Sequence, residues 1–326
     1  MSTSTNGPIL VDTGAAAPSE WQKKIEGTWH GRPSIFDAAG NHVGYEKVAR
    51  ASEFKDGKTL YWMNTKFDGG GKLRPRLELG GMFAFGVIDS DQDRIYLGPD
   101  FYGAGQPYGS FVDSNYYSPA WQSDLVTWNH VLPGTDLQVY SSVCYDGWTP
   151  ALVFNGVYLR TTDHETNPET QARIAAFMAE EERLGDMSFQ LPTKARGSWN
   201  GEVEVYTPDQ KLVGTNEVTI AHDPKPDLIR SSATVTWKGV LDRTYSFDRI
   251  RNGRNIQLLG PDYFGNQMAY GRCSFVRAHF NQTAEKIVGR EFILDDNYRL
   301  VVNWQVFAGN QLAYVIHGVL DWNADS

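Results

Sequence analysis

His130 is the residue whose type and surroundings best suit proton transfer in this sequence of 326 residues. It lies in the segment LVTWNHVL, where alternation along an extended strand places Val126, Trp128 and His130 on one face. An imidazole with an ordinary pKa of about 6.5 can donate or accept a proton near neutral pH. We therefore predict that His130 is a general acid or base facing an interior pocket. The alternative is a histidine that is satisfied within a packed core.

Two tyrosines and a serine could assist His130. The segment LQVYSSVCY alternates in the same way, which predicts that Ser141 and Tyr145 face the pocket and that Cys144 faces outward. In this hypothesis Tyr145 and Tyr102 orient or protonate the ligand. Aromatic walls suit a flat, apolar molecule, and the residues expected to bind the substrate are Tyr61, Phe83, Phe85, Trp128 and Ser141.

A repeated hexapeptide gives Asp100 two interpretations. The sequence GPDFYG contains Asp100, and the same pattern recurs as GPDYFG with Asp262. Because both copies keep the aspartate, the repeat favours a turn in which the carboxylate accepts backbone N–H groups. A catalytic Asp100 is the alternative. Tyr102 stands where the second copy has Phe264, and this difference makes the Tyr102 hydroxyl a candidate proton donor.

The sequence contains no recognisable signature of metal, nucleotide or serine-hydrolase chemistry. Its seven histidines show neither His-x-His nor His-Glu-x-x-His spacing, so no metal site is predicted. A Gly-x-Gly-x-x-Gly loop between a strand and a helix, a Walker motif and a Gly-x-Ser-x-Gly elbow do not occur either. We therefore expect a protein that uses no cofactor.

The composition limits the partners and the compartment. A net charge of -9 and a pI of about 5.3 argue against nucleic acid and against an anionic membrane surface, because both need clustered Lys and Arg. The first residues show neither a basic start nor a long apolar run, so no signal peptide or anchor is predicted. The two cysteines do not form a disulfide framework, which fits a reducing cytoplasm. Assembly into a homo-oligomer is left open.

The elements that must position these residues arise from an internal duplication. GTWHG at 27–31 matches GSWNG at 197–201 at a separation of 170, whereas the repeated Gly-Pro-Asp is separated by 162. The first copy therefore carries 170 − 162 = 8 extra residues, which we place in the loop from Gly69 to Gly81. Its Arg74 and Arg76 could meet a carboxylate or cover the mouth of a pocket. An ordinary solvated hairpin is the alternative.

Both halves are predicted to be all-β. Short segments rich in aromatic and β-branched residues, separated by Gly, Asp, Asn and Pro, are typical of antiparallel strands in a sandwich or a barrel. Between the halves, Asn167, Pro168 and Glu169 predict the start of one helix. The predicted parts are a disordered tail at 1–17, a first barrel with the active site at 18–163, a linker helix at 164–192 and a second barrel at 193–326.

One motif carries a resemblance to a known fold family. The segment SEWQKKIEG leads into Gly27-Thr28-Trp29, which is repeated as Gly197-Ser198-Trp199, and this resembles the Gly-x-Trp entry strand of calycin or lipocalin-like barrels. Two such barrels in tandem resemble the two-domain lipocalin-like proteins of secondary metabolism, including cofactor-free cyclases and carotenoid hydratases. The resemblance implies two tandem antiparallel calycin-like barrels joined by one helix.

The two copies also differ in polarity. Where the first has His130, Ser141, Tyr61 and Tyr145, we align the second with Phe292, Val302, Ser231 and Val306. This difference predicts a polar pocket in the first barrel and a packed core in the second. A site between the barrels stays open, because Gln138 and Tyr140 are expected on the opposite face, where they could form a domain interface.

The expected function follows from this pocket. We predict a cofactor-independent cyclase, isomerase, hydratase or lyase that acts on a small hydrophobic or aromatic natural product by acid/base and orientation catalysis. The alternative is a non-catalytic carrier of a hydrophobic small molecule. A structural or interaction protein is the third class. Polar groups in one barrel alone favour the enzyme over the carrier.

Overall fold

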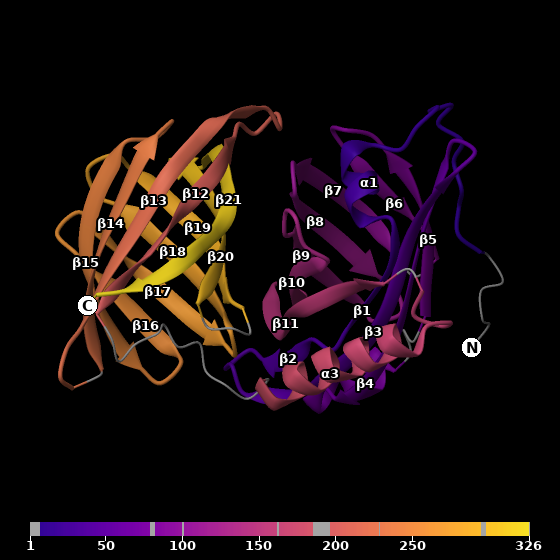
Figure 1. The fold of residues 1–326 in the computed structure, drawn as a ribbon, viewed down its shortest axis with the longest axis horizontal. Helices are drawn as coiled ribbons and strands as arrows, with labels where there is room; N and C mark the ends of the chain where they lie inside the picture. The colour runs from indigo at the N-terminus through magenta and orange to yellow at the C-terminus, as the bar shows by residue number, and fades with distance from the viewer. Residues whose placement is uncertain are drawn as a thin grey trace. The chain divides into compact units, whose positions relative to one another are not determined.

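The computed structural model describes residues 7–78, 82–99, 101–161, 163–184, 196–227, 229–294 and 298–325, without the side chains of Met82 and Phe83. The chain divides into two compact units, Met1–Asp186 and Met187–Ser326. Each unit is an antiparallel β-barrel (Figure 1). The prediction of an all-β protein with two tandem barrels is therefore confirmed.

Two partial strands share one position in the first barrel. β1 (Gly27–Gly31) and β2 (Ser34–Asp37) each pair with β11 (Thr149–Thr161) and with β3 (His42–Lys55), which closes the barrel. Pro33 lies between them and has no N–H to donate to a ladder. The eleven strands thus fill ten positions. The others are β4 (Lys58–Gly69), β5 (Met82–Asp89), β6 (Arg94–Leu97), β7 (Tyr102–Tyr108), β8 (Phe111–Ser118), β9 (Ser123–Val131) and β10 (Leu137–Asp146).

The second barrel closes directly, because its first strand pairs with its last. Neighbours in the sequence are neighbours around the barrel. Its strands are β12 (Gly197–Tyr206), β13 (Leu212–Pro224), β14 (Arg230–Gly239), β15 (Arg243–Asn252), β16 (Asn255–Leu259), β17 (Tyr263–Tyr270), β18 (Cys273–Phe280), β19 (Glu285–Ile293), β20 (Arg299–Ala308) and β21 (Gln311–Ala324).

A short helix before the first strand and a longer helix after the last strand accompany the first barrel. α1 (Glu20–Ile25) begins after Ser19, whose hydroxyl accepts a hydrogen bond from the Gln22 N–H at 3.1 Å. α3 (Pro168–Leu184) begins after Asn167, whose side-chain oxygen accepts two N–H groups of the first turn. The helix predicted from this capping pattern is confirmed, and it lies along the outside of the first barrel (Figure 1). Among the described residues, no helix has the length and hydropathy needed to cross a bilayer.

The extra segment of the first copy forms two short helices rather than a hairpin, η1 (Gly71–Leu73) and α2 (Arg74–Leu77). Leu77 is buried in an interior cluster with aromatic residues of the barrel. Arg76 donates hydrogen bonds to the main-chain oxygens of Trp121, at 2.8 Å, and Gln122, at 2.6 Å. Residues 79–81 lie outside the described part of this segment.

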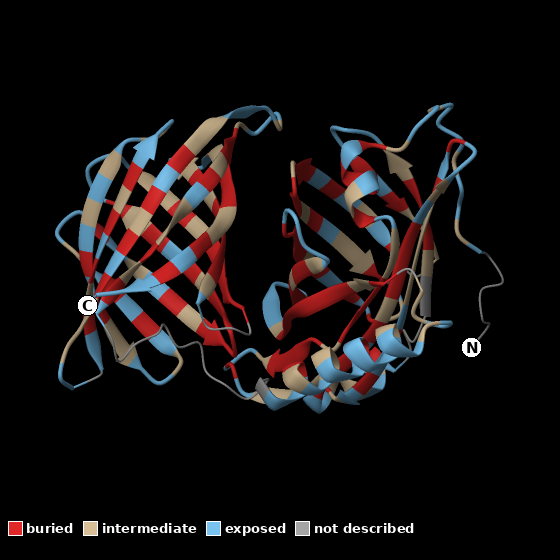
Figure 2. Cartoon of the chain, viewed as in Figure 1, coloured by how far each residue is buried: buried red, intermediate tan, exposed pale blue. Residues whose placement is uncertain are grey.

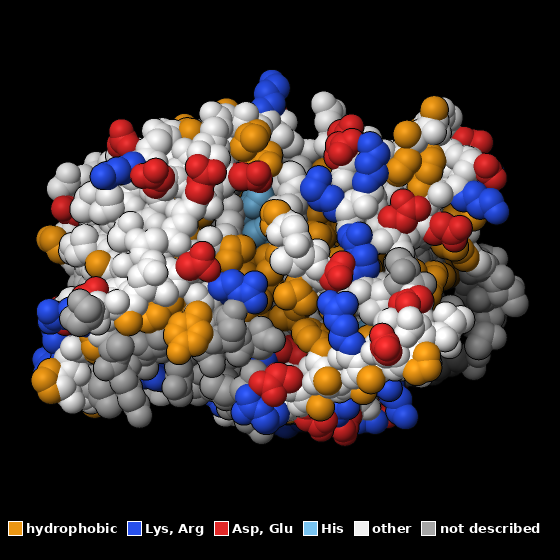
Figure 3. Space-filling view, in the orientation of Figure 1, with side chains coloured by type: hydrophobic (Ala, Val, Ile, Leu, Met, Phe, Trp, Pro, Cys, Tyr) orange, Lys and Arg blue, Asp and Glu red, His pale blue; other side chains and the backbone are white. Residues whose placement is uncertain are grey.

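Most strands alternate between buried and exposed residues, as Figure 2 shows clearly for the second barrel. In the first barrel, β9 and β10 depart from this rule because buried residues occur on both of their faces. On the face of the molecule drawn in Figure 3, acidic and basic side chains are interspersed.

Candidate functional site

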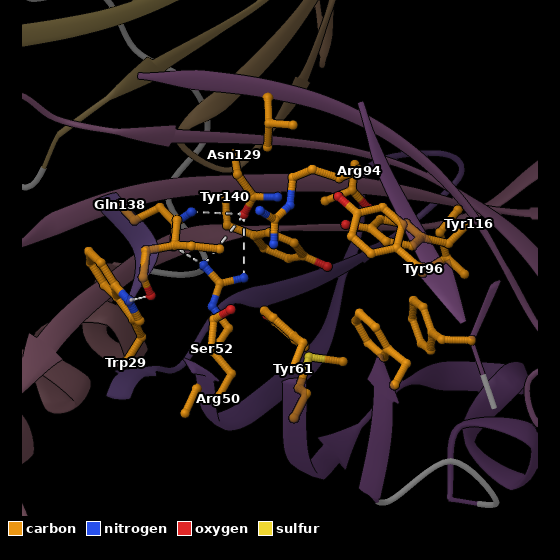
Figure 4. A pocket seen from close by; sticks show the side chains of 18 of the residues that line it. Trp29, Arg50, Ser52, Tyr61, Arg94, Tyr96, Tyr116, Asn129, Gln138 and Tyr140 are labelled. Carbon is orange, nitrogen blue, oxygen red and sulfur yellow. Dashed lines mark hydrogen bonds between the residues drawn. The ribbon is translucent and has the colours of Figure 1, made fainter. Parts of the chain in front are cut away.

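The interior of the first barrel encloses a cavity of about 60 Å³. One ordered water needs roughly 10–15 Å³ of such space, so the cavity is several times larger than a water site. Trp21 and Ile25 of α1 form part of its wall. Figure 4 labels further polar and aromatic side chains of the wall: Trp29, Arg50, Ser52, Tyr61, Arg94, Tyr96, Tyr116, Asn129, Gln138 and Tyr140.

Arg50 of β3 is the central polar group of this wall. It is buried, and its guanidinium donates hydrogen bonds to the side-chain oxygens of Gln138 and Asn129. Its guanidinium carbon also lies 3.9 Å from the centre of the Tyr158 ring. Both hydrogen-bond acceptors are neutral amides, and no carboxylate of the described residues lies within ion-pair distance of Arg50. The positive charge is therefore held by dipoles and a ring rather than by an anion.

Arg94 is also a buried arginine, but unlike Arg50 it is paired with a carboxylate. It forms an ion pair with Asp89, and both side chains are almost fully buried. Its guanidinium also donates a hydrogen bond at 3.1 Å to the side-chain oxygen of Gln22, on α1, and Ser52 donates one to the same oxygen at 2.8 Å. Arg94 thus has its counter-ion inside the protein and fastens α1 to the barrel.

Three tyrosines around Arg50 are kept protonated by their surroundings. Burial raises the pKa of Tyr61, Tyr116 and Tyr140 above the usual value for a phenol. Tyr61 stacks on Phe85 with ring centres 4.8 Å apart. These hydroxyls can donate hydrogen bonds to an oxygen-bearing ligand without ionising near neutral pH.

Glu46 lies on the same face of β3 as Arg50. Residues 46, 48, 50 and 52 alternate inward, because Arg50 and Ser52 line the cavity and Val48 belongs to an interior cluster. Burial raises the pKa of the Glu46 carboxyl to about 8, and the neighbouring Arg50 only partly opposes this shift. A carboxyl with such a pKa holds its proton near neutral pH and can exchange it.

Two of the residues predicted to bind a ligand, Tyr61 and Phe85, line this cavity. The side chain of Phe83 and the whole of Asp100 lie outside the described residues. In the second copy, the carboxylate of Asp262 accepts a hydrogen bond from the Gln282 side chain at 2.7 Å, on the exposed surface.

The predicted orientation of His130, Trp128 and Ser141 is wrong. The residues of β9 that line the cavity are Leu125, Thr127 and Asn129, so Trp128 and His130 point away from it. On β10 the lining residues are Gln138 and Tyr140, so Ser141 also points outward. The physical reason is that both faces of these strands are buried, and an apolar face therefore does not identify the interior. His130 instead lies beside Phe111, with ring centres 6.3 Å apart.

Three further residues, Cys144, Tyr145 and Tyr102, also lie elsewhere than predicted. Cys144, predicted to face outward, is buried in an interior cluster. Tyr145, predicted to face inward, lines an outer groove, and so does Tyr102, which is 52% exposed and packs against Tyr117. Trp148 completes this groove. The structure thus brings Tyr102 and Tyr145 together, but outside the barrel cavity.

Gln138 and Tyr140 were expected on the outer face, where they could form a domain interface. Both instead line the cavity. A comparison of the two copies at a uniform offset could have found them. At an offset of 162, the opposed pair Ser141 and Trp128 corresponds to Asn303 and Arg290, which are also opposed. Our alignment of β10 with β20 was shifted by one residue, and this shift hid the contrast between polar and aliphatic interiors.

The second barrel has a smaller interior cavity of about 20 Å³. Its buried Glu291 has partners within the barrel: Gln267 donates to its carboxylate at 2.9 Å and the Trp304 indole N–H at 3.2 Å. The ring of Trp304 stacks on that of Trp237, with centres 5.5 Å apart. Large rings and the hydrogen-bonded Glu291 therefore fill much of this interior.

Comparisons with known proteins bear on the fold. No family model matches the chain, and no curated protein does. A solved structure of a protein of unknown function from the DUF3598 family of Nostoc punctiforme is similar over 94% of this chain and 100% of its own, with a TM-score of 0.58 and 9% sequence identity. A second structure, from Bacteroides fragilis, has a TM-score of only 0.24 at 9% sequence identity, which is too low to support a common fold. The first likeness supports the two-barrel fold and leaves the function open.

Proposed function

We propose that the interior of the first barrel binds a small, mostly aromatic or apolar molecule that carries an anionic oxygen group, and that Arg50 binds this group. The observation that carries the proposal is the buried guanidinium of Arg50, which lines the interior cavity and is held by two neutral amides. A small hydrophobic or aromatic ligand is what the resemblance to calycin-like barrels implies, and Arg50 adds an anionic group to this ligand class.

The energetics of burial support an anionic ligand. A buried charge is strongly disfavoured unless a counter-charge or several hydrogen bonds compensate it. The hydrogen bond to Gln138 and contact with the Tyr158 ring supply part of this compensation, and the long bonds of 3.4 Å to Asn129 supply little. A carboxylate can accept two parallel N–H groups of a guanidinium, which is the strongest form of this contact. An acidic ligand would therefore gain more at Arg50 than a neutral one.

The surrounding rings define the rest of the ligand. Trp29, Tyr61 and Phe85 contribute aromatic surface to the cavity wall, and Met63 adds a flexible apolar side chain. Such walls bind flat or apolar groups, whereas the polar atoms fix their orientation. A ring bearing one acidic substituent matches both features once wall side chains such as the flexible Met63 move to enlarge the cavity of about 60 Å³.

A second candidate function is cofactor-independent conversion of the same ligand, by isomerisation, cyclisation, hydration or elimination. Glu46 favours it, because it lies on the inward face of β3 near the cavity-lining Arg50, and a buried carboxyl with a pKa of about 8 can exchange a proton near neutral pH. In this scheme Arg50 stabilises developing negative charge on the ligand, and Tyr140 and Tyr61 donate hydrogen bonds to it. His130, which points away from the cavity, has no part in the scheme.

The direct test compares benzoate with its neutral analogue benzamide. Binding is followed through tryptophan fluorescence, since Trp21, Trp29 and Trp121 line the cavity. Arg50→Ile should weaken benzoate binding about 100-fold, because losing one partner of a buried charge pair costs about 2–5 kcal/mol. Benzamide binding should change little, which also shows that the variant is folded. Equal loss of both ligands, or unchanged benzoate affinity, would rule out the proposed role of Arg50.

A further inference from the structure

A groove of about 590 Å³ lies outside the first barrel, between α3 and the outer faces of β1, β3 and β4. The helix contributes an apolar wall, with Ile174 and Met178 among its lining residues. The strands contribute a basic wall that carries Lys47, Lys66 and His30. The groove is thus amphiphilic, and it is separate from the cavity inside the barrel.

His30 is a buried polar group that faces this groove without a hydrogen-bond partner for its Nε2 atom among the described residues. Its side chain is only 8% exposed, and its ring centre lies 4.0 Å from that of His164. Burial, with smaller effects of His164 and Lys47, lowers the pKa of His30 to about 4, so the ring is neutral near pH 7. Its ring can donate or accept a hydrogen bond according to its tautomer.

The charges of the groove are not balanced. Lys47 and Lys66 are directly opposed across β3 and β4, an arrangement in which like charges repel. The acidic residue of the groove, Glu182, lies 3.3 Å from Arg32 and forms an ion pair with it. Of the described residues, neither lysine has a carboxylate at ion-pair distance. An anion bound between the lysines would remove their repulsion.

The opposed lysines do not carry the inference alone, because Lys55 and Lys58 form the same kind of pair at the exposed end of the hairpin. The difference is the setting. Lys47 and Lys66 are exposed as well, but they border a groove that also contains a buried imidazole and an apolar helix face. Three independent features therefore meet at one place: excess positive charge, a polar ring without a partner and a hydrophobic wall.

We propose that this groove binds a phosphate monoester with an apolar substituent. The phosphate lies between Lys47, Lys66 and the two imidazoles, and the apolar part packs against Ile174 and Met178. A phosphate monoester carries nearly two negative charges at neutral pH and several acceptor oxygens, which match two lysines and a nearby imidazole. The inference is independent of the ligand inside the barrel, since the two sites share no polar group.

The test uses hexyl phosphate as the probe and the histidine ring signals in NMR spectra of the full chain as the readout. The signals of His30 and His164 should shift and saturate. Lys47→Gln combined with Lys66→Gln should weaken binding at least about tenfold, because the two charge-assisted contacts are lost. The matched control, Lys55→Gln with Lys58→Gln, removes the same charge from the same strands and should leave the affinity within about twofold.

The outcomes separate the parts of the proposal. Absence of a saturable shift in the wild-type chain, or equal weakening in the two double variants, would overturn the site. Inorganic phosphate that binds as tightly as hexyl phosphate would overturn the role of the helix face. Hexanol that shifts the same signals as strongly would overturn the role of the charge. Cooperative thermal unfolding of both double variants establishes that they are folded.

Discussion

The two barrels are built on the same plan, yet at several positions a polar residue inside the first barrel corresponds to an aliphatic residue inside the second. At the offsets of the repeat, Arg50, Gln138, Tyr140, Tyr96 and Tyr158 of the first barrel correspond to Ile220, Leu300, Val302, Leu258 and Leu320 of the second. Each of these residues of the second barrel belongs to its hydrophobic cluster. The comparison shows that the first copy has the larger cavity with more polar groups in its wall, whereas aliphatic and aromatic side chains fill most of the interior of the second.

A single pair of positions explains much of the difference in volume between the two interior cavities. Trp304 of the second barrel corresponds to Ser142 of the first, and Gly289 corresponds to Thr127. A methyl group built on Gly289 would lie 2.4 Å from the Trp304 ring, so the indole fits only because this neighbour has no side chain. In the first barrel Thr127 and Ser142 instead bond to each other, with their oxygens 2.8 Å apart. Two small hydroxyl residues therefore leave open the space that a tryptophan fills in the second copy.

The largest effect is expected from copying this pair. Thr127→Gly combined with Ser142→Trp should fill the first cavity and reduce benzoate binding by more than about 100-fold, at a stability cost of about 1–3 kcal/mol for overpacking. Thr127→Gly alone is the control and should retain binding. Fluorescence titration and thermal unfolding measure both effects. A double variant that folds and still binds benzoate would contradict the correspondence between the two interiors.

The next effect concerns Glu46 and pH. Its pKa is raised to about 8 in the folded protein from an ordinary value of 4.5, so the folded state holds the proton over that interval. The stability from this proton is fully present below about pH 4.5 and is lost as pH rises through about 8, with a limiting slope of about 1.4 kcal/mol per pH unit. Glu46→Gln should remove this slope.

This difference is measured by urea unfolding of the wild type and of Glu46→Gln at several values between about pH 5 and pH 8. The free energy of unfolding of the wild type should fall relative to that of the variant as pH rises. Glu53→Gln, which changes an exposed carboxyl of the same strand, is the matched control. Parallel pH curves for wild type and Glu46→Gln would show that Glu46 is ionised alike in the folded and unfolded chain.

The smallest effect is expected at His130. His130→Phe copies Phe292 of the second barrel, and His130 points away from the cavity. Benzoate affinity should therefore stay within about twofold of the wild-type value. A large loss would restore His130 to the site and would require that the cavity and the outer face of β9 are coupled.

The sequence was sufficient to predict the duplication, the barrels and the helix capped by Asn167, because these depend on local signals. Asn167 caps its helix through contacts within a few residues. The faces of β9 and β10 could not be predicted by the same rule. Alternation identifies a core only when one face meets water, and Trp128 and His130 are buried although they point away from the cavity.

Arg50 and Glu46 were missed for a different reason. A charged residue within a strand usually marks the solvent side, and both lie on a strand whose outward positions also include charged Lys47. Their burial depends on the closure of the barrel, through pairing of β1 and β2 with β3 and β11, which connects residues far apart in the sequence. The aliphatic counterpart Ile220 is the one sequence signal that could have placed Arg50 inside.

The measurement that most directly tests the central claim is native mass spectrometry of the protein from its own host, beside the Arg50→Ile variant made in the same host. We predict that the wild-type chain releases one small acidic molecule and that the variant lacks it. Incubation of this molecule with fresh protein, followed by chromatography, then separates a carrier from an enzyme. An acidic molecule retained equally by Arg50→Ile, or a bound molecule without an acidic group, would contradict the assignment of Arg50 as the anion-binding residue of the first barrel.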